Sequence, residues 1–208
     1  MNCIWITGGG SGVGAALARK LAESGERVVV SGHHREEDLT RVSAGRPGIL
    51  PFPLDVADSG AVRDGVQRIE HDIAPISLAV LTTGTATPVP LNAFNRERLL
   101  GQADAGVSGV LNCLGALVPV LRRRGYGHVA ILPPAGRGAG APLATLIETL
   151  GRDLAGSGIR IQVIDPGLVQ GPADAILRSL RSDQAMMKKS GDVRGFLKRL
   201  LPPILPRK

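Results

Sequence analysis

A glycine-rich stretch near the N-terminus contains the residues best suited to chemistry in this sequence. Residues 8–14 include five glycines. The apolar run 3–6 before them predicts a buried strand, and residues 15–22 after them have the spacing of a helix. Because glycines let the backbone approach an anion and a helix N-terminus offers free N–H groups, such a turn can hold a phosphate. The sequence therefore predicts a nucleotide-binding loop, with a plain turn as the alternative.

The end of the second expected strand bears on which dinucleotide such a loop would bind. In a dinucleotide fold, an acidic residue at this point holds the adenosine ribose diol and repels a 2′-phosphate. This chain has Gly32 there, followed by His33, His34 and Arg35. These residues favour NADP(H) over NAD(H) and make His33 a candidate cofactor contact. The alternative interpretation is an ordinary polar turn with surface histidines.

The remaining sequence alternates strands and helices. Strands are expected at 3–6, 26–31, 49–54, 77–83, 127–132 and 159–164, and helices at 15–22, 35–42, 59–72, 96–124 and 142–155. This alternation predicts an α/β fold with one doubly wound parallel sheet, strand order 3-2-1-4-5-6 and helices on both faces. Asp55 follows the third strand at its carboxyl end, where open α/β sheets bind ligands.

Length and charge limit how the chain is organised. Its 208 residues are enough for one domain with a sizeable core, and we expect a dinucleotide-binding domain over 1–175 and a basic, partly helical tail over 176–208. The tail holds nine lysines or arginines and two aspartates, which accounts for the whole net charge of +7. A neutral body argues against nucleic-acid binding. The tail can contact an acidic partner or a membrane surface, with a solvated or self-docked tail as the alternative.

The two cysteines, Cys3 and Cys113, lie far apart within apolar stretches. This placement predicts reduced, buried thiols rather than a disulfide or a metal site. The sequence shows neither a signal-peptide pattern nor an apolar run of about 18 residues, so we expect a cytoplasmic protein.

Residues 7–14 resemble the TGxxxGxG cofactor loop of the short-chain dehydrogenase/reductase family. Three further features match in order, namely Leu54-Asp55-Val56, Gly84 and Pro166-Gly167. The resemblance covers about residues 2–170 and implies a single Rossmann-type domain.

The resemblance also implies which residues contact the cofactor. The pyrophosphate would lie against Gly8, Ser11, Gly12, Val13 and Gly14. Asp55, next to Val56, would accept a hydrogen bond from the adenine amino group. Gly84 would pass beneath a ribose, and the backbone at Pro166 and Gly167 would face the nicotinamide.

The residues that this family uses for catalysis are missing from their positions. Family enzymes reduce a carbonyl with a Tyr-x-x-x-Lys pair, a serine on strand five and an asparagine on the long helix. The only tyrosine here, Tyr126, lies in the turn before strand five, and no lysine occurs between Lys20 and Lys188. Pro134 falls at the serine position and Gly106 at the asparagine position. We therefore predict no catalytic residue, and a cofactor-binding sensor, scaffold or partner subunit in place of an enzyme.

Two alternatives stay open. A divergent NADP-dependent oxidoreductase would need another proton donor, and the polar candidates are Thr83, Thr85, Thr145, Thr149, Arg137 and Arg152. Threonine without a base and a permanently protonated arginine are poor donors. The second alternative is an interaction protein that binds no nucleotide, since the missing lysine also removes a ribose contact. For that reason we expect any cofactor to bind weakly.

The resemblance also implies self-association. Family members commonly pair through the long helix and the helix before strand six, here 96–124 and 142–155. Small residues on the second helix would permit close contact there: Ala141, Ala144, Thr145 and Gly151. We therefore expect a homodimer or a homotetramer.

Overall fold

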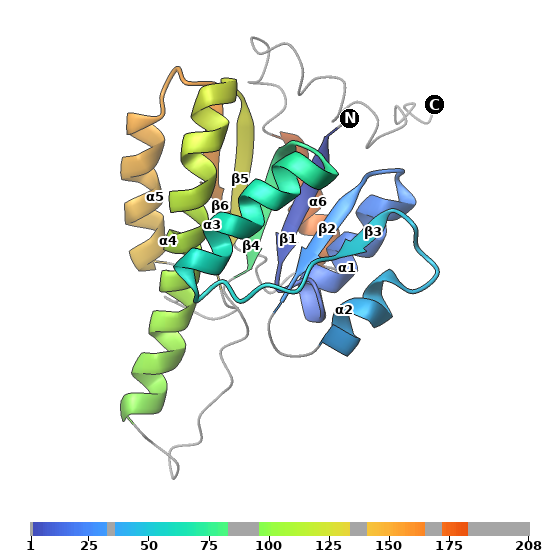
Figure 1. Ribbon diagram of the computed structural model, residues 1–208. Helices are drawn as coiled ribbons and strands as arrows, with labels where there is room; N and C mark the ends of the chain where they lie inside the picture. The colour runs from blue at the N-terminus through green and yellow to red at the C-terminus, as the bar shows by residue number, and fades with distance from the viewer. Residues whose placement is uncertain (1, 33–35, 83–95, 134–140, 165–171, 183–208) are drawn as a thin grey trace, which may run out of the picture.

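The computed structural model describes residues 2–32, 36–82, 96–133, 141–164 and 172–182 (Figure 1). Several predicted positions lie outside these residues: His33, His34, Arg35, Thr83, Gly84, Thr85, Pro134, Arg137, Pro166, Gly167 and the tail from 183 onward.

The protein is built on one six-stranded parallel sheet in the order β3-β2-β1-β4-β5-β6. The strands are β1 (Cys3–Thr7), β2 (Val28–Ser31), β3 (Ile49–Pro51), β4 (Ile76–Thr82), β5 (Gly127–Leu132) and β6 (Ile159–Val163). On the central strand, Ile4 pairs with Val28 on one side and with Leu78 on the other. The predicted fold class and strand order are confirmed.

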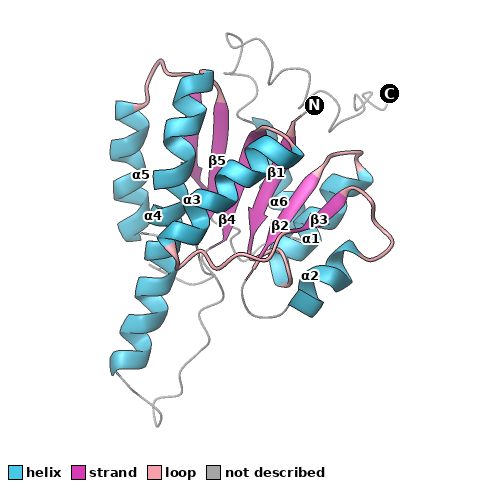
Figure 2. Ribbon diagram, in the orientation of Figure 1, coloured by secondary structure: helices cyan, strands magenta, loops and turns pink. Residues whose placement is uncertain are grey.

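Helices cover both faces of the sheet (Figure 2). They are α1 (Gly12–Glu23), α2 (Glu36–Ser43), α3 (Ser59–Arg68), α4 (Arg96–Arg124), α5 (Ala141–Asp153) and α6 (Pro172–Ser182), and a π-helical turn, η1 (Ile69–Ile73), extends α3. Apolar side chains of α1, α2 and α6 pack on one face, and those of α3, α4 and α5 pack on the other. None of the helices in the described part of the chain is both long and apolar enough to cross a membrane.

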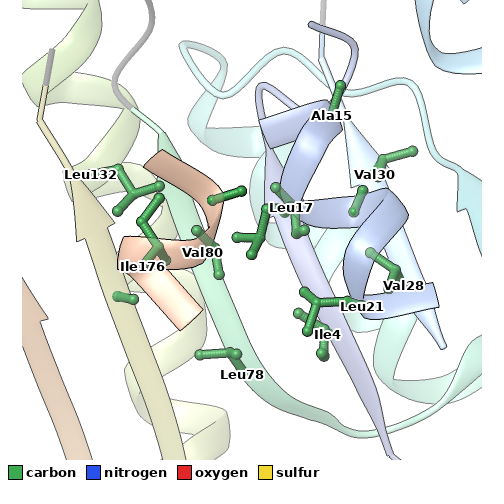
Figure 3. Close-up of a cluster of buried hydrophobic side chains, with 14 of the residues drawn as sticks. Ile4, Ala15, Leu17, Leu21, Val28, Val30, Leu78, Val80, Leu132 and Ile176 are labelled. Atoms are coloured by element: carbon green, nitrogen blue, oxygen red, sulfur yellow. The ribbon is translucent and has the colours of Figure 1, made fainter. Parts of the chain in front are cut away.

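All five residues of β1 are buried because this strand is central and covered on both faces. Ile4 and Ile6 face the α1 and α6 layer, whereas Cys3 and Trp5 face the α3 and α4 layer. Figure 3 shows the first of these clusters, with Leu17 of α1 among its members.

Helix α6 continues the core beyond residue 175. Ile176 and Leu180 are buried, and Ile176 lies near Leu132 and Val80 (Figure 3). Lys20 of α1 and Asp174 of α6 form an ion pair of 2.5 Å that joins the two helices. The boundary that we expected between domain and tail therefore falls within a helix that packs on the core.

Strand β3 is shorter than the predicted 49–54 and lies at the edge of the sheet, as its prolines indicate. Proline has no N–H to donate, and here the alternate residues Phe52 and Leu54 donate to the Val30 and Gly32 carbonyls, which leaves Pro51 and Pro53 on the open edge of the sheet. After it, Asp58 caps α3 by accepting hydrogen bonds from the backbone N–H groups of Gly60 and Ala61.

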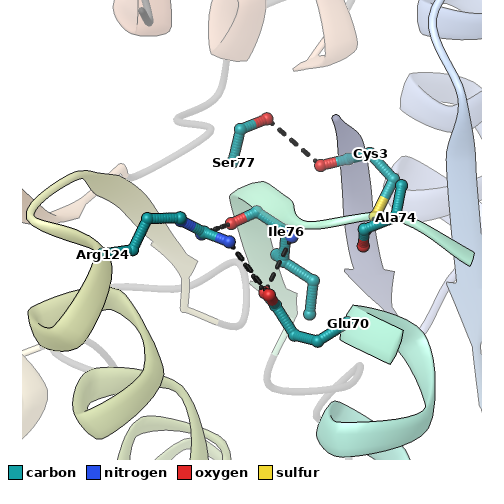
Figure 4. A network of polar contacts seen from close by, with 6 residues as sticks. All are labelled: Cys3, Glu70, Ala74, Ile76, Ser77 and Arg124. Carbon is teal, nitrogen blue, oxygen red and sulfur yellow. Dashed lines mark hydrogen bonds and ion pairs between the residues drawn. The ribbon is translucent and has the colours of Figure 1, made fainter. Parts of the chain in front are cut away.

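A polar network ties α4 and η1 to the amino-terminal end of β4 (Figure 4). The Arg124 guanidinium pairs with Glu70 at 2.9 Å and donates to the carbonyl of Ile76, and Glu70 accepts from the Ile76 N–H at 2.8 Å. The Cys3 thiol donates to the Ala74 carbonyl at 3.2 Å. Because these contacts lie at the edge where β1 and β4 begin, they anchor α4 and η1 at the edge opposite the glycine turn.

Both cysteines are free and buried, as predicted. Burial raises the pKa of each thiol, Cys3 and Cys113, to about 12. Such thiols stay protonated at neutral pH, and no group of potential metal ligands comes together within the described residues.

Candidate functional site

The turn between β1 and α1 has the geometry of an anion-binding loop. Gly8 and Gly12 adopt positive φ angles of 62° and 53°, which only glycine adopts without strain. Ser11 is the N-cap of α1, and its side chain makes no capping hydrogen bond. The first turn of α1 carries no acidic residue. The N–H groups at the N-terminus of α1 therefore have no capping side chain at Ser11. The first helical turn also places no negative charge beside them.

Three glycines in this turn are required by close packing. A Cβ on Gly8 would lie 2.1 Å from the Thr82 Oγ1, one on Gly9 would lie 2.7 Å from the Val30 Cβ, and one on Gly14 would lie 2.5 Å from the Gly8 carbonyl oxygen. Gly12 differs, because no atom of the described residues lies within 4 Å of its Cβ position. The turn is thus packed tightly against the sheet on one side and open at Gly12.

A reciprocal pair of hydrogen bonds holds the turn against β4. The Thr7 hydroxyl oxygen accepts from the Thr82 N–H at 3.0 Å, and the Thr82 hydroxyl donates to the Thr7 carbonyl at 2.8 Å. This pair fixes the carboxyl ends of the two central strands, from which the glycine turn begins.

Asp55 lies at the same edge of the sheet. The Leu54 N–H donates to the Gly32 carbonyl at 3.4 Å, which joins this segment to the end of β2. The Asp55 side chain is exposed, and its Oδ1 accepts from the Ala57 N–H at 2.9 Å. That bond uses one carboxylate oxygen and leaves Oδ2 as an acceptor for a ligand.

The structure thus brings part of the predicted site together. Gly8, Ser11, Gly12, Val13 and Gly14 form the turn, and Asp55 and Val56 follow β3 at the same edge. Ser11 and Gly12 are exposed, while Val13 and Val56 are half-buried.

The structure places Tyr126 away from this edge. It lies immediately before β5, at the amino end of that strand, with the Arg124 guanidinium carbon 4.5 Å from its ring centroid. Gly106, at the position of the family asparagine, is half-buried within α4 and has no side chain. Thr145, Thr149 and Arg152 are exposed on α5, and the Thr149 hydroxyl donates to the Thr145 carbonyl.

Sequence reasoning missed two residues that shape the site, Thr82 and Asn112. Asn112 of α4 donates from Nδ2 to the Val56 and Ala57 carbonyls at 3.0 and 3.1 Å. No local pattern signals either contact, because the partners lie 75 and 56 residues apart in the chain.

Two curated relatives are similar over most of this chain. An uncharacterized oxidoreductase of Myxococcus xanthus is 32% identical over 179 residues, which span 79% of this chain and 71% of that protein. Oxidoreductase BOA17 of Botryotinia fuckeliana is 26% identical over 180 residues, which span 80% of this chain but only 66% of that protein.

Solved structures share the fold. The 3-ketoacyl-(acyl-carrier-protein) reductase of Brucella melitensis, crystallised with NADH, superposes with a TM-score of 0.72 at 20% identity and covers 80% of this chain and 75% of its own. A gluconate 5-dehydrogenase of Burkholderia cenocepacia, in complex with NADP and tartrate, has a TM-score of 0.69 at 25% identity and covers 88% of this chain and 78% of its own.

The family profile described as short chain dehydrogenase matches residues 2–133, which include the glycine turn, the Asp55 loop and strands β1 to β5. This chain therefore belongs to the short-chain dehydrogenase family of oxidoreductases.

Proposed function

We propose that this chain binds a nicotinamide dinucleotide at the glycine turn and has lost the carbonyl-reducing chemistry of its family. The open N-terminus of α1 is the observation that carries the binding part. Gly12 has free space above it, and no side chain of the first turn competes for the N–H groups. A pyrophosphate there would receive hydrogen bonds and the positive end of the helix dipole. Asp55 would accept from the adenine amino group through Oδ2.

We propose NADP(H) as the preferred dinucleotide. Gly32, at the end of β2, offers no carboxylate to repel a 2′-phosphate. Asp38 of α2 lies beside the glycine turn, since a Cβ on Gly10 would lie 3.2 Å from the Asp38 Cβ. The Arg41 guanidinium lies 2.7 Å from that carboxylate and offsets its charge. Solved relatives contain either NADH or NADP, so the preference depends on such local residues.

The loss of catalysis is supported by Gly106 and Tyr126. Gly106 cannot supply the side-chain amide that the family asparagine provides. Tyr126, the only tyrosine in the sequence, lies at the amino end of β5, whereas the glycine turn lies at the carboxyl ends of the strands. No lysine between Lys20 and Lys188 is available to lower a donor's pKa. A general acid contributes about 10²–10⁴-fold to such reactions, so turnover should stay near background even with cofactor bound.

Oxidation of NADPH with a panel of simple ketones and aldehydes, followed by absorbance at 340 nm, tests this loss. We expect no rate above that of buffer. Turnover of about 1 s⁻¹ or faster, a typical enzyme rate, would instead establish a divergent oxidoreductase.

We also propose that the chain forms a homodimer or homotetramer through α4 and α5. Leu111 of α4 is 44% exposed and is the only large hydrophobic residue so exposed among the described residues. Within the described part of the chain, nothing lies within 4 Å of the Cβ positions of Gly115 on α4 or Gly151 on α5, so a partner helix could approach both closely.

A further inference from the structure

The segment that carries Asp55 follows β3, and up to Leu54 it still bonds to β2 and its end, since the Phe52 and Leu54 N–H groups donate to the Val30 and Gly32 carbonyls at 2.9 and 3.4 Å. Strand β3 ends at Pro51 and α3 begins only at Ser59, and between them the chain runs across the edge of the sheet toward α4 (Figure 1). Within the segment, the Asp55 carboxylate accepts from the Ala57 N–H, and the Asp58 N–H donates to the Asp55 carbonyl at 3.3 Å. These bonds lie within the segment, so they fix the local turn but do not hold the peptide groups after Val56 against another element.

Helix α4 supplies the external support. The Nδ2 of Asn112 donates to the carbonyls of Val56 and Ala57 at 3.0 and 3.1 Å. An amide nitrogen has two hydrogens, so one group can satisfy both carbonyls at once. One turn earlier, Gly109 lets α4 approach, since a Cβ there would lie 2.8 Å from the Val56 Cγ2. Asn112 therefore holds the two peptide groups that follow Val56, the first of which contains the Ala57 N–H.

We propose that Asn112 is a positioning residue for the adenine contact of Asp55. By fixing the carbonyls of Val56 and Ala57, it also fixes the Ala57 N–H, which in turn orients the Asp55 carboxylate. Without this bond, the carboxylate would lose its place opposite the adenine amino group, while the glycine turn and its phosphate contacts stay intact. The inference rests on the proposed cofactor binding and adds a specific role for α4.

The test compares NADPH with its deamino analogue, in which hypoxanthine replaces adenine and the 6-amino group is absent. Affinities are measured by isothermal titration calorimetry. The unmodified chain should prefer NADPH, because only NADPH donates to Asp55. Asn112→Ala should weaken NADPH binding about three- to tenfold, the range of one hydrogen bond, and leave the analogue almost unaffected. Asn112→Asp, which has the same shape but sets a carboxylate against two carbonyls, should do at least as much.

Two controls separate this role from general stability. Ser108→Asp adds the same charge one turn away, at an exposed position of α4, and should change neither affinity. In a chain that already carries Asp55→Ala, adding Asn112→Ala should not weaken NADPH binding further, because the carboxylate that Asn112 positions is already absent. A merely structural role would lower the affinities of both dinucleotides together.

The outcomes are distinct. Loss of the preference for NADPH in both Asn112 variants, with binding of the analogue retained, supports the inference. Variants that weaken both dinucleotides equally would overturn the inference alone. An unmodified chain that binds NADPH without preferring it would overturn the inference together with the proposed adenine contact of Asp55, and would leave cofactor binding at the glycine turn standing. An unmodified chain that binds neither dinucleotide would overturn the proposed function and this inference with it.

Discussion

Gly12 is the residue at which a side chain would most directly obstruct the proposed phosphate site. Its Cβ position is open and its φ is 53°. We predict that Gly12→Leu abolishes NADP(H) binding, because the side chain would extend into the space that the pyrophosphate would occupy. Calorimetry of the purified variant measures this.

Gly25 provides the matched control for that substitution. It follows α1, has a φ of 84°, and nothing lies within 4 Å of its Cβ position. Gly25→Leu therefore introduces a similar backbone strain, about 1–2 kcal/mol, away from the glycine turn. It should lower the melting temperature as Gly12→Leu does and leave cofactor binding unchanged. Equal loss of binding in both variants would show that strain, and not obstruction, is responsible.

His128 makes the stability depend on pH. It is 4% exposed, its Nε2 has no hydrogen-bond partner among the described residues, and burial together with nearby Arg160 lowers its pKa from 6.5 to about 4. Below pH 6.5 the imidazole of His128 binds a proton in the unfolded chain but stays neutral in the folded chain, so the free energy of unfolding falls as the pH drops toward 4. We predict that, relative to a His128→Gln variant, the unmodified chain loses about 2 kcal/mol between pH 7 and pH 5.

Urea unfolding of both chains at the two pH values measures that difference. His71, whose side chain is 90% exposed, is the control, and His71→Gln should lose stability with pH as the unmodified chain does. An unmodified chain and a His128→Gln variant with the same pH dependence would contradict the assignment.

At the scale of elements, Arg124 joins α4, η1 and β4. The side chains of the Arg124–Glu70 pair are only 16% and 18% exposed. Arg124→Met removes the cation and leaves a half-buried carboxylate without its partner, so we predict a loss of about 2–3 kcal/mol in unfolding free energy. The neighbouring Arg123→Met, at an exposed position, should change it by less than about 0.5 kcal/mol. Denaturant unfolding midpoints at pH 7 measure the stability of both variants. Equal losses of stability in Arg124→Met and Arg123→Met would contradict the role of Arg124.

The elements of the fold could largely be predicted because their signals are local. The apolar run before the glycines, the helical spacing after them and the helix expected from residue 59 all depend on neighbours within a few residues, and the structure confirms these elements. β3 was expected to extend to residue 54, and its regular ladder ends at Pro51, although the Phe52 and Leu54 N–H groups still donate to the Val30 and Gly32 carbonyls. An apolar pattern does not show where regular pairing ends.

The contacts that position the site could not be predicted in the same way. The Thr7–Thr82 pair and the bonds from Asn112 join segments far apart in the chain, and each depends on the register of packed elements. Polar residues at such positions look like any surface threonine or asparagine in the sequence. Packing geometry, and not local composition, gives them their roles.

At the scale of the whole molecule, Leu111 tests the proposed self-association. We predict that the chain sediments as a dimer or tetramer at micromolar concentration, and that Leu111→Arg shifts it toward the monomer by placing a charge in the proposed α4 interface. Sedimentation velocity measures both. An unmodified chain that sediments as a 21.6 kDa monomer would contradict the proposal.

The most direct test of the account is a calorimetric titration of the unmodified chain with NADP(H) and NAD(H). We predict a single site per chain with a dissociation constant on the order of 10–100 µM for NADP(H), weak because the family lysine that binds the ribose is missing, and weaker binding of NAD(H). A tenfold preference for NAD(H) would contradict the interpretation of Gly32. No binding of either dinucleotide at millimolar concentration would contradict the central claim that the glycine turn is a cofactor site.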